Sequence, residues 1–535
     1  MRAILTVLRR HNAIVVFLSA IFIARLFLAD WNSYWSDELL SVAVYGVWND
    51  DLVAMVSHLA DNSIHPPLYQ IVLYLWMSVF GDSEVATRAL SDLNMTVAAA
   101  FLYAIVTRSH GRLVAFFGAA GFSLMSWTMY YGLESRSYAQ TALLVTVSSW
   151  ALLRFLDGTR SGEPWRSRAQ LAVLAVLAVA NTGLMLTHYY NAFWIVAQGV
   201  FFALFVIRER RLISWPGALT VLSLIGIVPV GVFFAAWGRV FIAQYQSRAD
   251  DYVVEGGSAS LNPVQLLAGT IVRSNLDMPT VLILASALLI AAAVVVAGVR
   301  IIRPSRSVQN SDWVTLYLAS WLVLPLAVTY LAFTVMGVER YSARYFIFSA
   351  PPLVPLLVIA IAWFVRLLGR GHPAVMPVTA AASALALVVA VVPGGLAAAQ
   401  DRKDDWRGIT KRLVQTIHQD PGHRYTIIET GFGGESRARF YLEQFSPDIR
   451  AEIFTSRNQE TAGDYSAPEA QFPQSDESDF VVVLYLHLRE PNLPLLSAVL
   501  DEHYDEHYRQ LDSQGRGFVV YRVDSSTAAP TGPVG

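Results

Sequence analysis

Long apolar runs recur along the first three quarters of the chain, each about as long as a helix that crosses a bilayer. Such a helix takes about 20 apolar residues, because each residue adds 1.5 Å and the hydrocarbon core is about 30 Å thick. Eleven runs fit: 13–29, 89–107, 113–131, 137–156, 170–187, 189–207, 213–236, 279–299, 313–335, 345–365 and 374–394. The pattern predicts a polytopic α-helical membrane protein with about 11 transmembrane helices.

The first run could also be a signal peptide, because Arg9 and Arg10 precede it. Arg25 interrupts the apolar stretch, however, and no small-x-small cleavage site follows it. We therefore expect an uncleaved membrane anchor.

Residues 64–80 (IHPPLYQIVLYLWMSVF) are apolar but short. If they do not span, the basic clusters of the helical region fall into alternate loops, which the positive-inside rule assigns to the cytoplasm. These residues are Arg108, Arg112, Arg160, Arg166, Arg168, Arg208, Arg210, Arg211, Arg300, Arg303, Arg306, Arg366 and Arg370. The segment is therefore expected to lie flat on the outer surface. An odd number of spans then places the C-terminus outside the cytoplasm.

From about residue 400 the composition becomes that of a soluble domain. Three runs predict buried strands, 425–429, 479–486 and 517–523, and two predict helices, 437–445 and 493–504. Alternating strands and helices indicate a small α/β domain. The expected organisation is a transmembrane domain over 1–399 with an outer-face loop at 30–88, a soluble periplasmic α/β domain over 400–525, and a disordered tail at 526–535.

Composition narrows the classes of function. The residues are 55% hydrophobic and 15% charged, with a mean hydropathy of +0.44, whereas soluble domains are about 25% charged. With 39 Lys and Arg against 41 Asp and Glu, the net charge is −2, which argues against nucleic acid as a partner. The absence of cysteine excludes disulfides, thiolate catalysis and cysteine-ligated metals.

Polar residues gather at the ends of the runs that this topology places on the outer face. The candidate site residues are Asp37, Glu38, His65, Tyr69, Glu134, Arg136, Tyr138, His188, Arg340, Arg344 and Tyr345. A charge costs about 2.5–3.5 kcal/mol at the centre of a membrane helix, so charges near the bilayer tend to line functional cavities. Their shared face predicts one active site.

Each group also has a structural interpretation. Asp37 and Glu38 could form a solvated helix cap, and Glu134 and Arg136 a structural pair in a tight turn. His188 between tyrosines could be an interfacial anchor.

The arginines are open to more than one interpretation too. Arg340 and Arg344, one helical turn apart, suit a phosphate, but lipid headgroups would satisfy them equally. Arg88 and Asp92 are expected to form an i,i+4 pair that locks a helix end.

Several of these motifs together resemble a known family. Trp35-Ser36-Asp37-Glu38, His65-Pro66-Pro67-Leu68-Tyr69, Arg88-Ala89-Leu90-Ser91 and Glu134-Ser135-Arg136-Ser137-Tyr138-Ala139 resemble the GT-C membrane glycosyltransferases of family 39. This group contains the protein O-mannosyltransferases and bacterial transferases that modify lipid A. The resemblance covers about residues 1–410.

The resemblance implies inverting transfer of a sugar from a polyprenyl-phosphate donor on the outer, periplasmic face of the bacterial inner membrane. Asp37 matches the position of the family's catalytic acidic residue, while His65, Glu134 and Arg136 match the region that organises donor phosphate and acceptor. Mannose or another hexose or uronic acid is the expected sugar. The acceptor hydroxyl could belong to a protein, a lipid A core or a polysaccharide, so the expected partners are a lipid-linked sugar, membrane lipid and a protein or glycolipid acceptor.

This chemistry agrees with the residue types. A sugar phosphate leaves as an anion whose second pKa is about 6, so one base for the acceptor hydroxyl suffices. Asp37 can be that base, and Arg136, Arg340 and Arg344 can stabilise the leaving phosphate. The sequence identifies no certain cofactor. A divalent metal held by Asp37, Glu38, His65 and Glu134 stays open.

Three other functions compete with this one. A transporter or flippase for a lipid-linked saccharide would place polar residues near the bilayer midplane, whereas here they lie at one face. A scaffolding protein would not need the Asp-Glu and His-Pro-Pro pairings. A ligase or polymerase that moves whole glycan chains stays open.

Overall fold

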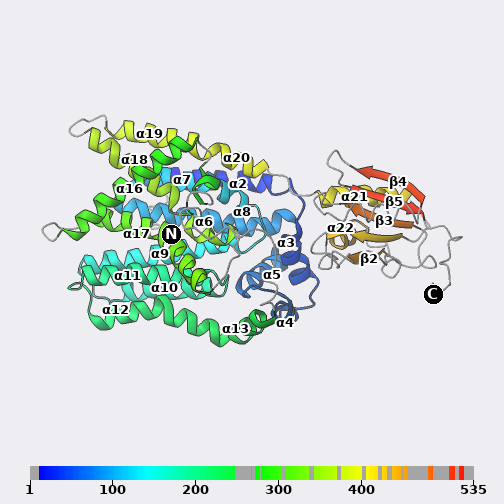
Figure 1. Ribbon diagram of the computed structural model, residues 1–535, viewed down its shortest axis with the longest axis horizontal. Coiled ribbons are helices and arrows are strands. Elements are labelled where there is room, and N and C mark those ends of the chain that lie inside the picture. Colours follow the sequence, from blue (N-terminus) through cyan, green and yellow to red (C-terminus); the bar gives the residue numbers. More distant parts are fainter. Residues whose placement is uncertain are drawn as a thin grey trace. The chain divides into compact units, whose positions relative to one another are not determined.

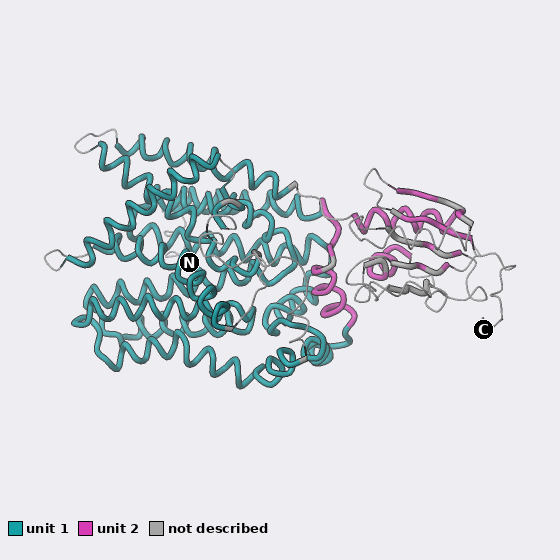
Figure 2. The backbone as a smooth tube through the Cα atoms, in the orientation of Figure 1, with its two compact units in different colours: residues 1–30, 49–401 teal, residues 31–48, 402–535 magenta. Residues whose placement is uncertain are grey.

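The computed structural model describes a large part of the chain. The described residues are 11–247, 267, 271–276, 279–303, 309–336, 343–369, 375–400, 405–419, 425–429, 437–446, 451–455, 480–485, 505–511 and 517–522. The chain divides into two compact units (Figure 2). The first, the membrane unit, comprises Met1–Asp30 and Asn49–Asp401. The second comprises Trp31–Trp48 and Arg402–Gly535, so the segment 31–48 groups with the C-terminal residues and not, as expected from the sequence, with the membrane domain.

Each predicted span coincides with a helix or a helix pair (Figure 1). They are α2 (Asn12–Leu28), α6 (Glu84–His110), α7 (Arg112–Leu124) with α8 (Ser126–Gly132), α9 (Tyr138–Arg160), α10 (Arg168–Met185), α11 (Asn191–Arg208), α12 (Trp215–Leu222) continuing through η2 (Ser223–Ile227) into α13 (Val228–Ser247), α16 (Thr280–Ile302), α17 (Asn310–Met336), η4 (Ala343–Ser349) with α18 (Leu353–Leu368), and α19 (Val375–Ala390) with α20 (Val392–Gln400).

Among the described residues, nine helices are long and apolar enough to cross a membrane, or ten if α7 and α8 form one bent span. The remaining predicted span, α2, is an apolar helix of 17 residues. The prediction of a polytopic α-helical fold is confirmed, and the chain is a multi-pass membrane protein.

Polar side chains join the helices inside the membrane unit. Ser148 of α9 donates to Asn181 Oδ1 of α10 at 2.6 Å, and Gln198 of α11 donates to Ser148 Oγ at 2.8 Å. Asn181 in turn donates to Gln198 Oε1 at 2.9 Å. Apolar side chains gain little by leaving lipid for a helix interface, so such hydrogen bonds help to fix the helix arrangement.

A buried ion pair fastens α2 to α6. Arg25 Nε lies 2.7 Å from Asp92 Oδ1, and both side chains are 1% exposed. Arg25 also donates to the carbonyl of Ser123 at 3.1 Å. The predicted pairing of Arg88 with Asp92 is therefore wrong: Arg88 donates to the carbonyl of Ala29 at 2.6 Å, because Arg25 from the neighbouring helix neutralises Asp92.

Two shorter helices of the membrane unit, α4 (Leu52–Asn62) and α5 (Leu68–Phe80), follow the segment 31–48. The 13 residues of α5 extend about 20 Å at 1.5 Å per residue, which is too short for a hydrocarbon core of about 30 Å. This length agrees with the expectation that 64–80 does not span.

The second unit contains a five-stranded sheet in the order β2-β1-β3-β5-β4. The strands are β1 (Tyr425–Glu429), β2 (Ala451–Thr455), β3 (Phe480–Tyr485), β4 (Asp505–Leu511) and β5 (Gly517–Arg522). β1 is parallel to β2 and β3, while β5 is antiparallel to β3 and β4. Two described helices, α21 (Trp406–Gln419) and α22 (Arg437–Phe445), accompany the sheet.

The prediction of a small α/β domain is confirmed. The three expected strands and the expected helix at 437–445 are present. The sequence did not predict β2, β4 or α21. The expected helix at 493–504 and the expected tail at 526–535 lie outside the described residues.

The segment 31–48 contains α3 (Ser36–Leu39), which continues into the π-helix η1 (Leu40–Val47). It carries Asp37 and Glu38, and its contacts are described with the candidate active site.

Candidate active site

Three connections at one end of the membrane unit converge on a histidine-arginine cluster. His65 precedes α5, Arg136 lies in the turn between α8 and α9, and His188 lies in the turn between α10 and α11. The main-chain N–H of Leu68, the first residue of α5, donates to the carbonyl of Leu186 at 2.9 Å. That hydrogen bond fixes the His65 connection against the His188 turn.

Arg136 and His65 form the first contact of the cluster. Arg136 Nη2 donates to His65 Nε2 at 3.3 Å. Because a guanidinium has no acceptor, Nε2 of His65 must carry a lone pair, and the imidazole is neutral in this arrangement. The hydrogen bond therefore fixes the orientation of the guanidinium group of Arg136, which is 7% exposed.

His188 packs at the centre of the aromatic part of the cluster. Its ring lies 5.2 Å from that of His65, 5.5 Å from that of Tyr190 and 5.1 Å from that of Tyr345. The side chain is 6% exposed. The cluster thus joins three predicted site residues, His65, His188 and Tyr345, and adds Tyr190, which the sequence did not single out as a site residue.

The protonation of His188 follows from its surroundings. Burial, together with the positive charges of Arg136 and Arg344, lowers the pKa of His188 from 6.5 to about 3. Its Nδ1 accepts the main-chain N–H of Tyr190 at 3.2 Å, so the neutral ring carries its proton on Nε2. Within the described residues this Nε2–H is buried and has no hydrogen-bond partner. It is a free donor for an oxygen of a bound ligand.

Arg344 and Tyr138 border the same cluster. The guanidinium carbon of Arg344 lies 5.7 Å from the ring centre of Tyr345. Tyr138, the first residue of α9, is 2% exposed and interacts electrostatically with Arg136, Arg344 and Glu134. Two guanidinium groups and two phenols thus surround His188 and Glu134, which suits recognition of an anion such as a phosphate.

The turn that carries Glu134 and Arg136 is held by hydroxyl groups of α6. Ser91 donates to the carbonyl of Glu134 at 2.7 Å, and Ser135 donates to Thr87 Oγ1 at 2.8 Å. Glu134 is 1% exposed. The Arg-Ala-Leu-Ser step therefore has a structural function: Ser91 anchors the arginine-bearing turn.

The remaining predictions for the membrane unit have mixed outcomes. Tyr69 is buried in the first turn of α5, four residues after His65. Arg340 lies outside the described residues. The described residues contain no group of three or more His, Asp or Glu side chains that could hold a metal ion. A metal at Asp37, Glu38, His65 and Glu134 stays a prediction.

Asp37 and Glu38 belong to the second unit, in the single turn of α3. Glu38 is fully buried, and its Oε2 accepts the main-chain N–H of Trp35 at 3.3 Å. It is a helix-capping carboxylate but not a solvated one. Asp37 is half-buried, and its carbonyl accepts from Ser41 Oγ at 3.3 Å. The catalytic role of Asp37 stays a prediction.

Helix α22 of the C-terminal domain holds both ends of this segment. The main-chain N–H of Tyr34 donates to Tyr441 Oη at 2.7 Å. At the other end, Trp48 Nε1 donates to Glu443 Oε2 at 2.9 Å, and the guanidinium carbon of Arg439 lies 4.6 Å from the ring centre of Trp48. Sequence reasoning missed these contacts because nothing in the amino-acid pattern links positions 400 residues apart.

Comparisons with known proteins agree with this fold. The family model for dolichyl-phosphate-mannose-protein mannosyltransferase matches residues 64–233, less than half of the chain but including His65, Arg136 and His188. No curated protein matches the sequence.

Two solved structures of ArnT from Cupriavidus metallidurans are similar to the chain. The undecaprenyl-phosphate-bound form is 14% identical with a TM-score of 0.55, and covers 97% of this chain and 99% of that one. The apo form is 14% identical with a TM-score of 0.56, and covers 98% and 100%. The predicted resemblance to the GT-C membrane glycosyltransferases is confirmed at the level of the fold.

Proposed function

We propose that the chain is an inverting glycosyltransferase that moves a sugar from a polyprenyl-phosphate donor to an acceptor hydroxyl. The observation that carries the proposal is the cluster at one end of a GT-C fold in which the buried His188 lies near the positive charges of Arg136 and Arg344. The family model over residues 64–233 and the undecaprenyl phosphate bound to the similar ArnT structure support a lipid-linked donor.

The cluster suits the leaving group of this reaction. The acceptor oxygen attacks the anomeric carbon, the bond from that carbon to the phosphate oxygen breaks, and the polyprenyl phosphate departs with the bonding electrons. Arg136 and Arg344 would stabilise the negative charge that develops on the phosphate. The Nε2–H of His188 would donate to a phosphate oxygen, because this ring is neutral and its donor is otherwise unused.

Asp37 would accept the proton of the attacking hydroxyl. A general base speeds such a step by about 10²–10⁴-fold, and no general acid is needed, because the phosphate leaves as an anion. The adjacent Glu38 accepts the main-chain N–H of Trp35 at 3.3 Å and is therefore assigned a structural role, as a helix-capping carboxylate.

The positive-inside distribution of arginines supports an active site on the outer, periplasmic face of a bacterial inner membrane. Mannose, another hexose or a uronic acid is the proposed sugar, and a protein, a lipid A core or a polysaccharide the acceptor.

The test is transfer from a panel of radiolabelled polyprenyl-phosphate sugars to membrane acceptors, with the wild type beside Asp37→Asn. We expect transfer from one donor and about a 100-fold loss in Asp37→Asn. The exposed Asp50→Asn is the matched control and should keep full transfer. Undiminished transfer by a folded Asp37→Asn protein would remove Asp37 as the base. No transfer from any donor would favour a transporter or a glycan ligase.

A further inference from the structure

A cavity of about 340 Å³ lies at the other end of the membrane helices, away from the histidine-arginine cluster. The span that begins at Arg344 ends at Leu368, and Tyr345 and Arg366 are separated by 21 residues, or about 30 Å of helix. Tyr345 contacts the cluster, whereas Arg366 lines the cavity. The two sites therefore face opposite surfaces of the bilayer.

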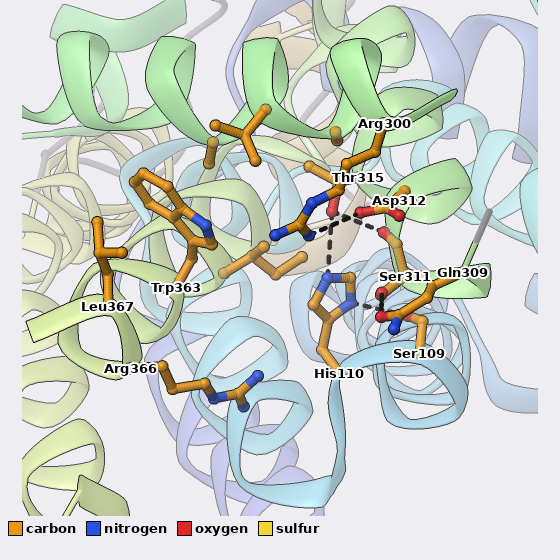
Figure 3. Close-up of a pocket in the computed structure, with 14 residues that line it drawn as sticks. Ser109, His110, Arg300, Gln309, Ser311, Asp312, Thr315, Trp363, Arg366 and Leu367 are labelled. Atoms are coloured by element: carbon orange, nitrogen blue, oxygen red, sulfur yellow. Dashed lines mark hydrogen bonds and ion pairs between the residues drawn. The ribbon is translucent and has the colours of Figure 1, made fainter. Parts of the chain in front are cut away.

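Both polar and apolar side chains line the cavity. His110 at the end of α6 hydrogen-bonds with Thr315 Oγ1 of α17 at 3.1 Å and with Ser109 Oγ at 2.8 Å. The small side chains of Ala293 and Ala297 on α16 are among the apolar lining residues. Figure 3 shows the side chains of Arg300 and Arg366 extending toward the space beside His110. Such a lining suits a molecule with an anionic head and an apolar body.

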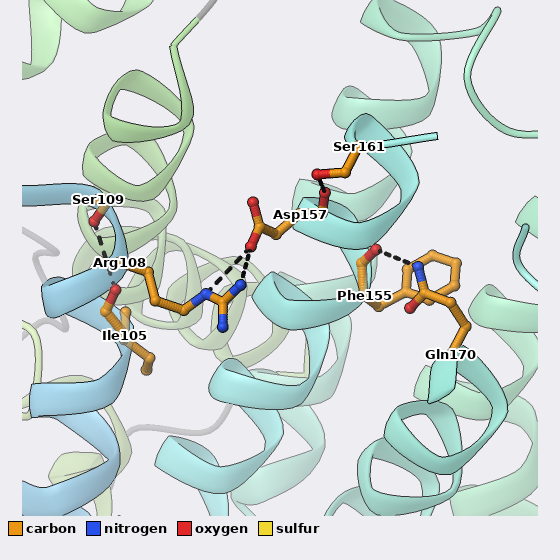
Figure 4. Close-up of polar contacts among 7 residues, drawn as sticks. All are labelled: Ile105, Arg108, Ser109, Phe155, Asp157, Ser161 and Gln170. Atoms are coloured by element: carbon orange, nitrogen blue, oxygen red, sulfur yellow. Dashed lines mark hydrogen bonds and ion pairs between the residues drawn. The ribbon is translucent and has the colours of Figure 1, made fainter. Parts of the chain in front are cut away.

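The charges in the cavity do not cancel. Arg300 lies 3.2 Å from Asp312, so one of the two guanidinium groups has a carboxylate partner. Arg366 makes no hydrogen bond or ion pair within the part of the chain that the structure describes. At the same end of the unit, Arg108 is tied by two hydrogen bonds to Asp157, at 3.2 and 2.6 Å (Figure 4). Arg366 is thus an exposed cation that lines the cavity and has no carboxylate partner among the described residues.

We infer that this cavity binds a phosphate group, with Arg366 as its main ligand and Arg300 beside it. Arginine recognises phosphate through paired N–H donors. Basic pockets between transmembrane helices are typical sites for the headgroups of anionic lipids. The apolar lining residues, Ala293 and Ala297 among them, would accept the glycerol and the first methylenes of such a lipid, whereas a free phosphate would use the arginines alone.

The test is native mass spectrometry of the full chain, purified in detergent and titrated with phosphatidylglycerol or with inorganic phosphate. We expect Arg366→Gln to bind phosphatidylglycerol about fivefold more weakly than the wild type, as one arginine near a membrane contributes about 1 kcal/mol. Arg168→Gln is the matched control, because Arg168 is an exposed arginine at the start of α10 that does not line the cavity. It should bind as the wild type does.

The two probes separate the possible sources of the phosphate. Arg366-dependent binding of phosphatidylglycerol that inorganic phosphate does not displace would identify a lipid headgroup. Arg366-dependent binding of inorganic phosphate would identify the free ion. Equal affinity of all three proteins for each probe would overturn the proposal. Neither binding measurement involves sugar transfer, so the outcome of this experiment does not depend on the proposed function.

Discussion

The groups proposed to stabilise the leaving phosphate and the group proposed to remove the acceptor proton are held by different scaffolds. Arg136, Arg344 and His188 lie at helix ends of the membrane unit. Hydrogen bonds from α6 hold the turn that carries Arg136, and a hydrogen bond from α5 holds the α10–α11 turn that carries His188. Asp37 lies on a segment that Tyr441 and its neighbours on α22 hold at both ends.

This difference has a consequence for the C-terminal domain. The oxygen of a general base must lie within about 3 Å of the oxygen whose proton it takes, so the position of its backbone matters as much as its acidity. Contacts from α22 fix the segment 31–48, and therefore the C-terminal domain is expected to affect the rate of transfer without touching the donor. Changes in the membrane cluster should instead act on the phosphate.

The largest effect is expected from the membrane cluster. Arg136→Gln should lower kcat by about 100-fold, because it removes a preorganised donor and a positive charge from the developing phosphate. Arg136→Lys, which keeps the charge but not the fork of donors, should recover part of this loss. Initial rates at saturating donor measure both effects.

The control for that change is Arg112→Gln, which alters an exposed arginine at the opposite end of the unit. It should leave kcat unchanged. An equal loss of kcat in Arg112→Gln and Arg136→Gln would show a general effect of charge. It would contradict a specific role for the arginine in the membrane cluster.

An intermediate effect concerns pH and stability. The pKa of His188 is lowered to about 3, so between pH 6.5 and 3 the unfolded chain binds a proton that the folded chain excludes. The stability of the folded state is therefore undiminished above pH 6.5 and falls below it by about 1.4 kcal/mol per pH unit. At pH 5 the loss is about 2 kcal/mol.

Melting temperatures of the wild type and His188→Gln between pH 7.5 and 5 test this expectation. The wild type should lose more stability on acidification than His188→Gln. His58→Gln, which alters a histidine on α4, should respond as the wild type does. Identical pH responses of wild type and His188→Gln would show that His188 is not held neutral.

The smallest effect is expected from the contacts between α22 and the segment 31–48. Tyr441→Phe leaves the buried N–H of Tyr34 without its acceptor at the cost of about 1 kcal/mol. We expect kcat to fall about fivefold while KM for the donor stays unchanged, because Tyr441 positions Asp37 and does not contact the phosphate. Tyr425→Phe, on strand β1, is the control.

A raised KM with unchanged kcat in Tyr441→Phe would contradict a positioning role. The same loss of kcat in Tyr425→Phe would assign the effect to the stability of the whole domain and not to the contact with the segment 31–48.

The membrane fold could be predicted well because lipid imposes one rule on every span. A helix must be apolar over about 20 residues, and each of the eleven predicted runs coincides with a helix or a helix pair. Helix ends were harder to predict. α13 continues to Ser247 instead of ending near 236. Its polar residue Gln244 hydrogen-bonds there with Tyr189 at 2.8 Å and with the carbonyl of Ala60 at 3.2 Å, and both partners are distant in the sequence.

The strands of the C-terminal domain could be predicted only in part. Strands β1, β3 and β5 are apolar runs and could be predicted. The edge strands β2 and β4 could not, since β4 (Asp505–Leu511, DEHYRQL) has almost no apolar residue. An edge strand is stabilised by hydrogen bonds to its neighbour, and its polar side chains protect the edge from further pairing.

The candidate site was predicted as a set of residues but not as a set of contacts. Topology brought His65, Arg136 and His188 to one face, and the structure adds that His188 is neutral and that Tyr190 completes the aromatic wall. Pairing could not be predicted where the partner lies on another helix. Arg25 takes Asp92 away from Arg88 because their helices pack together, and spacing along one helix does not contain that information.

The 56° bend between α7 and α8 affects how deep in the membrane Arg136 would contact the phosphate of a lipid-linked sugar. It occurs at Met125, where ψ is 153°, and the N–H of Trp127 after the break donates to Asn275 Oδ1 at 3.0 Å. For an α7 that runs along the membrane normal, the seven residues of α8 would rise about 6 Å instead of about 10 Å. The turn with Arg136 would then lie roughly 4 Å deeper than a straight helix would leave it. A lipid anchored in the bilayer could reach the arginine with its phosphate at headgroup level and its chain still immersed.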